Sequence, residues 1–140
     1  MKVEPGLQLP VAEHPIERPA LVRYAGASGD FNRIHWDDEF ARSVGLPGVI
    51  AHGMYSMALA ARSVSAFAGD PRALRRLRVR FSAMIRPGQT LVVTGAVAAV
   101  DDDGAVTLRF EALNDDGERV LAKGEAELAP SRNQSAAAAV

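Results

Sequence analysis

The sequence predicts an α+β fold in which an antiparallel sheet wraps around one long central helix. Helix patterns come first along the chain, and an alternating pattern typical of strands follows from residue 73 onward. The helix expected over 53–67 carries apolar side chains on most of its sides, which indicates a buried helix. A curved sheet covering that helix satisfies both observations within one domain, which we expect over residues 1–129.

The first half of the chain combines an extended segment with three helices. Pro19 suits the first turn of a helix, and Gly29 marks that helix's end because glycine accepts a left-handed cap. Asp37 is a good N-cap for the next helix. The expected elements are an extended segment over 6–17, a helix from Pro19, a loop over 30–36, a short helix over about 38–44 and the buried helix over 53–67.

The second half reads as a meander of antiparallel strands. Two runs, 101–104 and 114–117, end in Asp-Gly, which favours tight hairpin turns. The strands between the turns alternate apolar and polar side chains, and they are expected over 76–81, 91–100, 106–112 and 120–128. The tail over 130–140 offers little to bury, so we expect it to be disordered.

Composition excludes several classes of function. The 140 residues hold 16 Lys and Arg against 17 Asp and Glu, and this near-neutral balance lacks the basic footprint of nucleic-acid binding. The absence of cysteine excludes disulfides, thiolate nucleophiles and cysteine-ligated metals. The N-terminus has no apolar signal region, and residues 54–69 are too short and polar to span a bilayer, so we expect a cytoplasmic location.

Asp30 and His35 are the candidate acid/base pair. They lie five residues apart in one compact loop, which can direct both side chains into a single cleft. A reaction that shuttles protons needs two such groups within reach of one substrate. An Asp and a His in one loop are also a common capping pair, so their spacing alone leaves a structural role open.

A longer string around this pair carries a resemblance to a known family. It consists of Tyr24-Ala25-Gly26-Ala27-Ser28-Gly29-Asp30-Phe31-Asn32-Arg33-Ile34-His35-Trp36-Asp37, then Ile50-Ala51-His52-Gly53-Met54, then Gly69-Asp70-Pro71. The string resembles the MaoC-like family of R-specific enoyl-CoA hydratases and (3R)-hydroxyacyl-ACP dehydratases. It is most similar to the B subunits of the dehydratase of mycolic-acid elongation. The resemblance covers roughly residues 20–71.

The resemblance implies a hot-dog fold, usually dimerised through the sheet edge, and a hydro-lyase reaction. Water would add across the C2–C3 double bond of an acyl thioester, or leave the 3-hydroxy compound. By position, Asp30 and His35 match the family's catalytic pair. Gly53 begins the buried helix, where a backbone N–H and the helix dipole suit a thioester oxygen that becomes enolate-like.

Three further residues are candidates for the substrate side of the site. Asn32 is expected mainly to tie the loop through backbone hydrogen bonds. His52 is expected to orient the loop or to contact substrate, with the structural role favoured. Some hydratases have a serine in the central helix where this chain has Ala61, so Ser56 is the candidate for an assisting hydrogen bond. Arg33 stands where the family often has proline.

Two alternative functions remain open at this stage. The chain could be a hot-dog thioesterase, which would release free thiol from acyl-CoA, or a non-catalytic acyl-binding subunit of a heteromeric dehydratase. Retention of both Asp30 and His35 argues against the second. The expected partners are an acyl-ACP or acyl-CoA substrate, with ACP favoured, and a second hot-dog chain in a homodimer or heterodimer. We expect no metal, no cofactor, no nucleic acid and no membrane.

Overall fold

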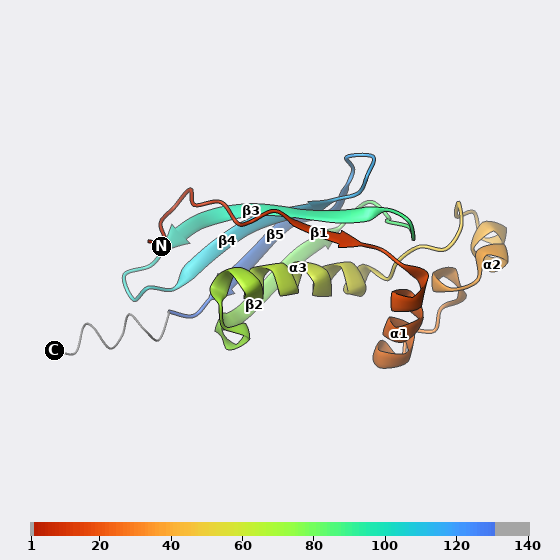
Figure 1. The fold of residues 1–140 in the computed structure, drawn as a ribbon, viewed down its shortest axis with the longest axis horizontal. Coiled ribbons are helices and arrows are strands. Elements are labelled where there is room, and N and C mark those ends of the chain that lie inside the picture. Colours follow the sequence, from red (N-terminus) through yellow and green to blue (C-terminus); the bar gives the residue numbers. More distant parts are fainter. Residues whose placement is uncertain (1, 131–140) are drawn as a thin grey trace.

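The computed structural model describes residues 2–130, so all but the first residue of the predicted disordered tail lies outside the described residues. Figure 1 shows the order of the elements along the chain. They are β1 (Ala12–Pro15), α1 (Arg18–Ser28), a 3-10 turn (Arg33–His35), α2 (Asp38–Ser43), α3 (Gly53–Ala68), a second 3-10 turn (Pro71–Ala73), β2 (Leu74–Phe81), β3 (Thr90–Val100), β4 (Val106–Leu113) and β5 (Arg119–Leu128).

Within the described residues, the strands form one five-stranded sheet in the order β1-β3-β4-β5-β2. Every neighbouring pair is antiparallel, and tight turns join β3 to β4 and β4 to β5 as predicted. The two glycines of those turns, Gly104 and Gly117, have φ of 86° and 75°, which explains the residue type there. The edges of the sheet are β1 and β2.

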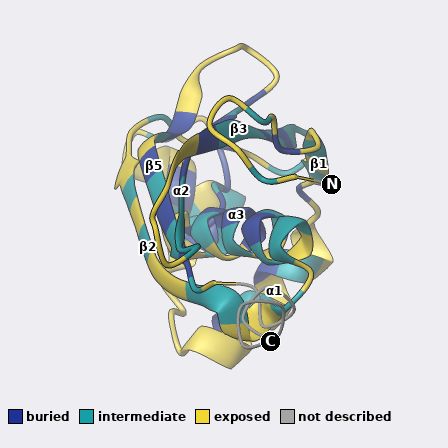
Figure 2. Cartoon of the chain, turned by 90° about the vertical axis from the view of Figure 1, so that its left-hand side faces the viewer, coloured by how far each residue is buried: buried dark blue, intermediate teal, exposed yellow. Residues whose placement is uncertain are grey.

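The sheet curves around α3, which lies along its concave side (Figure 2). The core forms between the sheet and the helix. Fully buried side chains there include Val64 of α3 and Leu91, Leu108 and Leu121 of the strands. Burial of large apolar side chains of this kind is the main favourable term in folding. The α+β architecture with one long helix against an antiparallel sheet is therefore confirmed.

The prediction that α3 is buried on most sides is wrong for this chain. Its buried residues are Ser56, Leu59, Ala60 and Val64, which recur every three to four positions and form one face. Met54, on another side of the helix, is 56% exposed. A single-layer sheet can cover only one face of a helix, so the apolar residues beyond that face stay accessible.

The helix ends follow the capping residues that the sequence indicates. Gly29 ends α1 in a left-handed conformation with φ of 76°. Asp37 begins α2, where its carboxylate accepts a hydrogen bond from the backbone N–H of Phe40 at 3.0 Å. These two ends hold the loop of residues 30–36 between α1 and α2.

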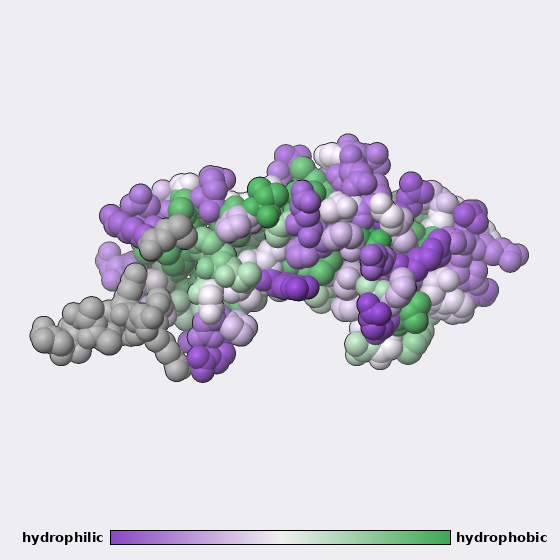
Figure 3. Space-filling view, viewed as in Figure 1, coloured by the Kyte–Doolittle hydropathy of each residue, from purple (hydrophilic) through white to green (hydrophobic). Residues whose placement is uncertain are grey.

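The surface on the face shown in Figure 3 is mixed, with hydrophilic residues gathered over α2 at the right-hand end. Apolar residues are scattered across the middle of this face. In the part of the chain that the structure describes, no helix has both the length and the hydropathy to cross a membrane.

Candidate active site

The loop after α1 fixes the Asp30 carboxyl group by short-range hydrogen bonds. The backbone N–H of Asp30 donates to Ser28 Oγ at 3.1 Å. The Oδ1 atom of Asp30 accepts a hydrogen bond from the backbone N–H of Asn32 at 3.2 Å. Asx turns of this kind set the direction of a side chain, and the free oxygen, Oδ2, faces His35.

Asn32 ties the loop, as the sequence predicts. Its Oδ1 atom accepts from the backbone N–H of Ile34 at 3.3 Å and so begins the 3-10 turn that ends at His35. The amide therefore acts on the path of the chain between the two candidate catalytic residues. Its hydrogen bond is to the backbone, which is a structural role.

His35 is oriented by a backbone carbonyl. Its Nδ1 atom lies 2.8 Å from the carbonyl oxygen of Ile50. A carbonyl can only accept, so Nδ1 carries the proton, and Nε2 of the neutral ring presents its lone pair to the site. The Nε2 atom lies 3.6 Å from Asp30 Oδ2. The structure thus brings the predicted acid/base pair together.

The two members of the pair differ in exposure. The His35 side chain is 8% exposed, whereas that of Asp30 is 51% exposed. A separation of 3.6 Å is too long for a direct hydrogen bond, and catalytic contacts of this kind often tighten only when substrate is bound. One side of the pair is open to a ligand in this chain.

His52 lies directly against both members of the pair. Its ring stacks on that of His35 with 3.8 Å between centroids and 22° between planes. Its Nε2 atom lies 3.1 Å from the backbone carbonyl of Asp30. Burial lowers the pKa of His52, the hydrogen bond to Asp30 raises it by less, and the neighbouring His35 lowers it further. The ring is therefore neutral near pH 7.

Gly53 is the first residue of α3, as predicted, so no residue of the helix can accept from its backbone N–H. The aromatic ring of Phe81, at the end of β2, packs against it. A Cβ atom at position 53 would lie 3.0 Å from Phe81 Cδ1 and 3.2 Å from Cε1. Glycine thus permits a close approach of the ring to the helix N-terminus, beside the Asp30–His35 pair.

Ser56 is placed one turn into α3, where it is 1% exposed. Its Oγ atom has no hydrogen-bond partner among the described residues, and the same holds for Nδ1 of His52. Two buried polar atoms without partners therefore lie four positions apart at the start of one helix. Among the described residues, the Ser56 hydroxyl therefore makes no hydrogen bond to the Asp30 or His35 side chain.

Several residues lie elsewhere than the sequence suggests. Phe31 and Trp36 are large apolar side chains of the kind usually found in a core, but they are 62% and 48% exposed. His14 has only polar and turn-forming residues beside it, but it is partly buried, and its Nε2 lies 2.9 Å from Ser63 Oγ, which joins β1 to α3. The local sequence carries no signal for either placement, because both depend on which strands and helices pack together.

Arg33 braces the loop instead of standing free at the site. Its guanidinium donates to Asp37 Oδ2 at 2.7 Å and lies over the ring of Phe40, 4.5 Å from its centroid. The hydrogen bonds from Phe40 and Arg33 hold the pKa of Asp37 below its usual range. An ion pair within the loop thus ties position 33 to the start of α2.

Two of the arginines of β2 are also paired. Arg76 lies 3.4 Å from Glu127, and Arg78 lies 2.6 Å from Glu125, both on the neighbouring strand β5. Ion pairs between exposed side chains are weak but they neutralise the local charge. This arrangement supports a solvated sheet face over an anion-binding stripe at these two positions.

Asp30, His35 and His52 have side-chain atoms within 4.8 Å of one another, as a metal site would require. The proton positions oppose this use. His52 Nε2 carries the proton that it donates to the carbonyl of Asp30. The other nitrogen of His52, Nδ1, is buried. The ligands accessible from the site are then His35 Nε2 and the Asp30 carboxylate, which is fewer than a stable zinc site uses.

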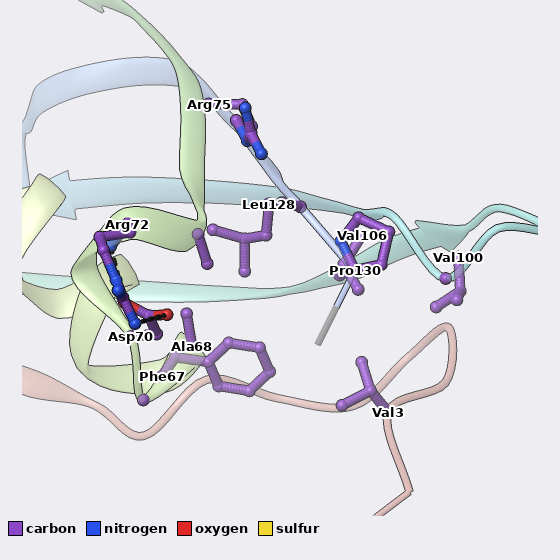
Figure 4. A pocket seen from close by; sticks show the side chains of 14 residues that line it. Val3, Phe67, Ala68, Asp70, Arg72, Arg75, Val100, Val106, Leu128 and Pro130 are labelled. Carbon is purple, nitrogen blue, oxygen red and sulfur yellow. Dashed lines mark hydrogen bonds and ion pairs between the residues drawn. The ribbon is translucent and has the colours of Figure 1, made fainter. Parts of the chain in front are cut away.

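A cavity of about 630 Å³ lies at the opposite end of α3 from the acid/base pair. Figure 4 shows Phe67, Val106 and Leu128 on its apolar side and Arg72 beside Asp70. The Arg72 and Asp70 side chains pair with each other, 3.0 Å apart. The charged side chains shown in this cavity therefore form an ion pair and not a second acid/base pair.

Comparison with known proteins places this geometry in a family. The profile described as the MaoC like domain matches residues 4–114. The fatty acid synthase beta subunit pkiC of Emericella nidulans is 33% identical over 132 residues, which are 90% of this chain and 6% of that protein. The chain thus spans a small fraction of the length of the curated relatives that it matches.

Solved structures give the same result for the fold. A MaoC-like dehydratase is 36% identical with a TM-score of 0.86, covering 94% of this chain and 41% of that one. The R-hydratase PhaJ1 from Pseudomonas aeruginosa is 26% identical with a TM-score of 0.80, covering 94% and 84%. A chain of the ChsH1-ChsH2 complex from Mycobacterium tuberculosis has a TM-score of 0.81 at 23% identity, covering 94% and 100%.

Proposed function

We propose that this chain, which belongs to the MaoC-like dehydratase family, catalyses the reversible hydration of a trans-2-enoyl thioester to the (3R)-3-hydroxyacyl thioester. The observation that carries the proposal is the Asp30–His35 pair. Its facing atoms are 3.6 Å apart, and the Ile50 carbonyl directs the lone pair of His35 Nε2 toward the carboxyl group. The family's hot-dog fold supplies the frame, and the R-hydratase similarity supports the reaction class.

The pair can both take up and supply a proton in one turnover. In hydration, one group accepts a proton from the attacking water as its oxygen bonds to C3, and the other protonates C2. Hydration thus requires one transferable proton on the pair at the start. The acid gives this proton to C2 while the base takes one from water, so the pair again holds one proton at the end, whichever residue is the base. Dehydration follows the same steps in reverse. General acid/base catalysis of this kind contributes about 100- to 10,000-fold.

The thioester oxygen needs a donor as negative charge develops on it. The backbone N–H of Gly53 is free of helix hydrogen bonds, and it stands at the positive end of the α3 dipole. A donor directed at developing charge contributes about 100- to 1,000-fold in rate. In this proposal Gly53 binds the carbonyl while Asp30 and His35 act on C2 and C3.

We also propose that a second hot-dog chain completes the site. Asp30 is half exposed, although its chemistry favours a sheltered cleft. Large exposed apolar side chains lie next to or against the site residues, and they are Phe31, Trp36, Met54 and Phe81, each 48% exposed or more. Such clustering is typical of a protein interface. The partner is a second copy of this chain or a related subunit.

The test follows the absorbance of the conjugated thioester when the purified protein meets a short trans-2-enoyl-CoA or the same acyl group on ACP. Asp30→Asn and His35→Ala each should lower kcat/KM by at least ~100-fold, because each removes one proton-transfer group. Asp103→Asn, an exposed change in the β3–β4 turn, is the matched control and should leave the rate unchanged.

Three outcomes decide between the candidate functions. Wild-type rates in both site variants would refute the assignment of the pair. Release of free thiol without loss of the double bond would show the thioesterase alternative instead. An inactive wild type on both carriers, alone and with a related subunit added, would support a non-catalytic acyl-binding role.

A further inference from the structure

We propose that His52 is the positioning residue of this site: a neutral imidazole that holds Asp30 through its backbone carbonyl and His35 through ring stacking. It touches both members of the pair at once, at 3.1 Å and 3.8 Å. The inference rests on the proposed function because it concerns the same pair. It assigns His52 no contact with substrate, since the residue is 1% exposed.

The hydrogen bond to Asp30 determines where the His52 proton lies. The carbonyl of Asp30 can only accept, so His52 Nε2 must donate. In a neutral ring, Nδ1 then carries a lone pair and no proton. That atom is buried and has no partner among the described residues. A proton there would place an N–H in the interior without an acceptor, which costs free energy. The environment therefore keeps the ring neutral.

Because His52 stacks on His35, the neutral state of the His52 ring affects the catalytic pair. The two rings are 22° from parallel with centroids 3.8 Å apart, so a charge on one would strongly oppose a charge on the other. His35 must be able to hold a proton during turnover, and a neutral neighbour allows it. The same stacking fixes the plane of the His35 ring, which the Ile50 carbonyl alone would leave free to tilt.

The fold holds His52 in this place from a third direction. The ring of Tyr24, on α1, meets His52 edge-on with 4.8 Å between centroids. Tyr24 also packs against Tyr55 of α3 at 5.4 Å. Helix α1, which leads into the Asp30 loop, is thereby joined through His52 to the start of α3. Small displacements at such a junction move the catalytic groups relative to each other.

The inference is tested by separating the two contacts of His52. His52→Gln retains a donor at the position of Nε2 but has no ring to stack. His52→Phe retains the ring but cannot donate. His52→Ala removes both. We expect kcat to fall by ~10-fold in the Gln and Phe variants and by ~100-fold in the Ala variant, with KM within ~3-fold of wild type, because misplacement of reacting groups lowers the rate more than binding.

His14→Ala is the matched control. It removes another partly buried histidine, which contacts Ser63 away from the pair. We expect it to lower the melting temperature while kcat stays at the wild-type value. If the His52 variants lose activity only in proportion to their loss of folded protein, or if KM changes and kcat does not, the positioning role is wrong.

A measurement without substrate separates this inference from the proposed function. Nitrogen NMR of the imidazoles should show His52 protonated on Nε2 alone at neutral pH, since its pKa is lowered by burial, and His52→Phe should shift the His35 ring signals. A charged ring or a proton on Nδ1 would overturn the inference even in an active enzyme. The expected NMR result in a protein without hydratase activity would overturn the proposed function and leave the positioning role standing.

Discussion

Two backbone carbonyls determine the proton positions of the site's histidines. The Ile50 carbonyl places the proton of His35 on Nδ1, and the Asp30 carbonyl places that of His52 on Nε2. The sequence predicted Asp30 and His35 through the string that surrounds them. The carbonyls could not be predicted, because any residue has one and only the folded path of the chain directs it.

Gly53 is the residue at which the close approach of an aromatic ring can be tested. Gly53→Ala places a Cβ atom about 3.0 Å from Phe81 Cδ1, tighter than ordinary contact, so the ring must move away from the helix N-terminus. We expect kcat/KM for hydration to fall by ~10-fold or more, since donors at the helix start act only when they are correctly placed. Steady-state kinetics with a short 2-enoyl-CoA measure the effect.

Gly26→Ala is the control for that substitution. Gly26 lies in α1, and a Cβ there would meet nothing within 4 Å. Alanine should stabilise the helix by about 0.5–1 kcal/mol and leave the rate unchanged. If the enzyme tolerates alanine at position 53 as well as it does at 26, the N-terminus of α3 is not the oxyanion donor.

At the scale of elements, the helix ends were predictable and the face of the long helix was not. Gly29 and Asp37 act locally, through φ and through one hydrogen bond, so the sequence identifies them. The burial of α3 depends on how much of it one sheet can cover. Met54 and Ala58 remain exposed because the wrapping sheet contacts only one face of the helix.

The β4–β5 hairpin is linked to the site through one buried amide. Asn114 is 5% exposed, and its Oδ1 accepts from the backbone N–H of Asp116 and of Glu118 at 3.0 Å each. Its Nδ2 donates to the carbonyl of Met84 at 3.2 Å. Ile85 follows Met84, and its carbonyl accepts a hydrogen bond from the backbone N–H of Ala51 at 2.8 Å. Ala51 immediately precedes His52 and α3.

Asn114→Ala should therefore lower the free energy of unfolding by about 2–3 kcal/mol, because it removes three hydrogen bonds between a buried amide and the backbone, each contributing about 1 kcal/mol. Urea unfolding followed by circular dichroism measures the change. Asn114→Asp keeps the two accepted hydrogen bonds but cannot donate to Met84, so an intermediate loss is expected.

The control for the hairpin substitution is Asp103→Ala in the other turn. Asp103 is exposed and accepts one hydrogen bond, from the backbone N–H of Ala105 at 3.1 Å. Substitutions of that kind change stability little. Equal losses from Asn114→Ala and Asp103→Ala would show that burial of the amide contributes nothing.

At the scale of the whole molecule, the sequence predicted the hot-dog architecture, and the structure and the related structures confirm it. Alternation and turn residues determine a meander locally, so this part needs no knowledge of packing. How exposed the site is could be learned only from the structure. Phe31 and Trp36 are apolar, and nothing in their neighbours shows that a single chain leaves them exposed.

Four exposed apolar residues form a rim around the site, and they are Phe31, Trp36, Met54 and Phe81. If a second chain covers the rim, Met54→Lys should weaken the assembly, because it places a charge at an apolar interface. Val22→Lys is the matched control, since Met54 and Val22 are both on helices and are 56% and 60% exposed. Sedimentation should show a smaller species for Met54→Lys alone.

Trp36, the single tryptophan, is 48% exposed in one chain. Its emission should shift to longer wavelength when wild-type protein is diluted, because dilution favours separate chains. An emission spectrum that stays constant on dilution, together with a wild-type protein that sediments as one chain at every concentration and remains active, would contradict the proposal that a partner completes the site.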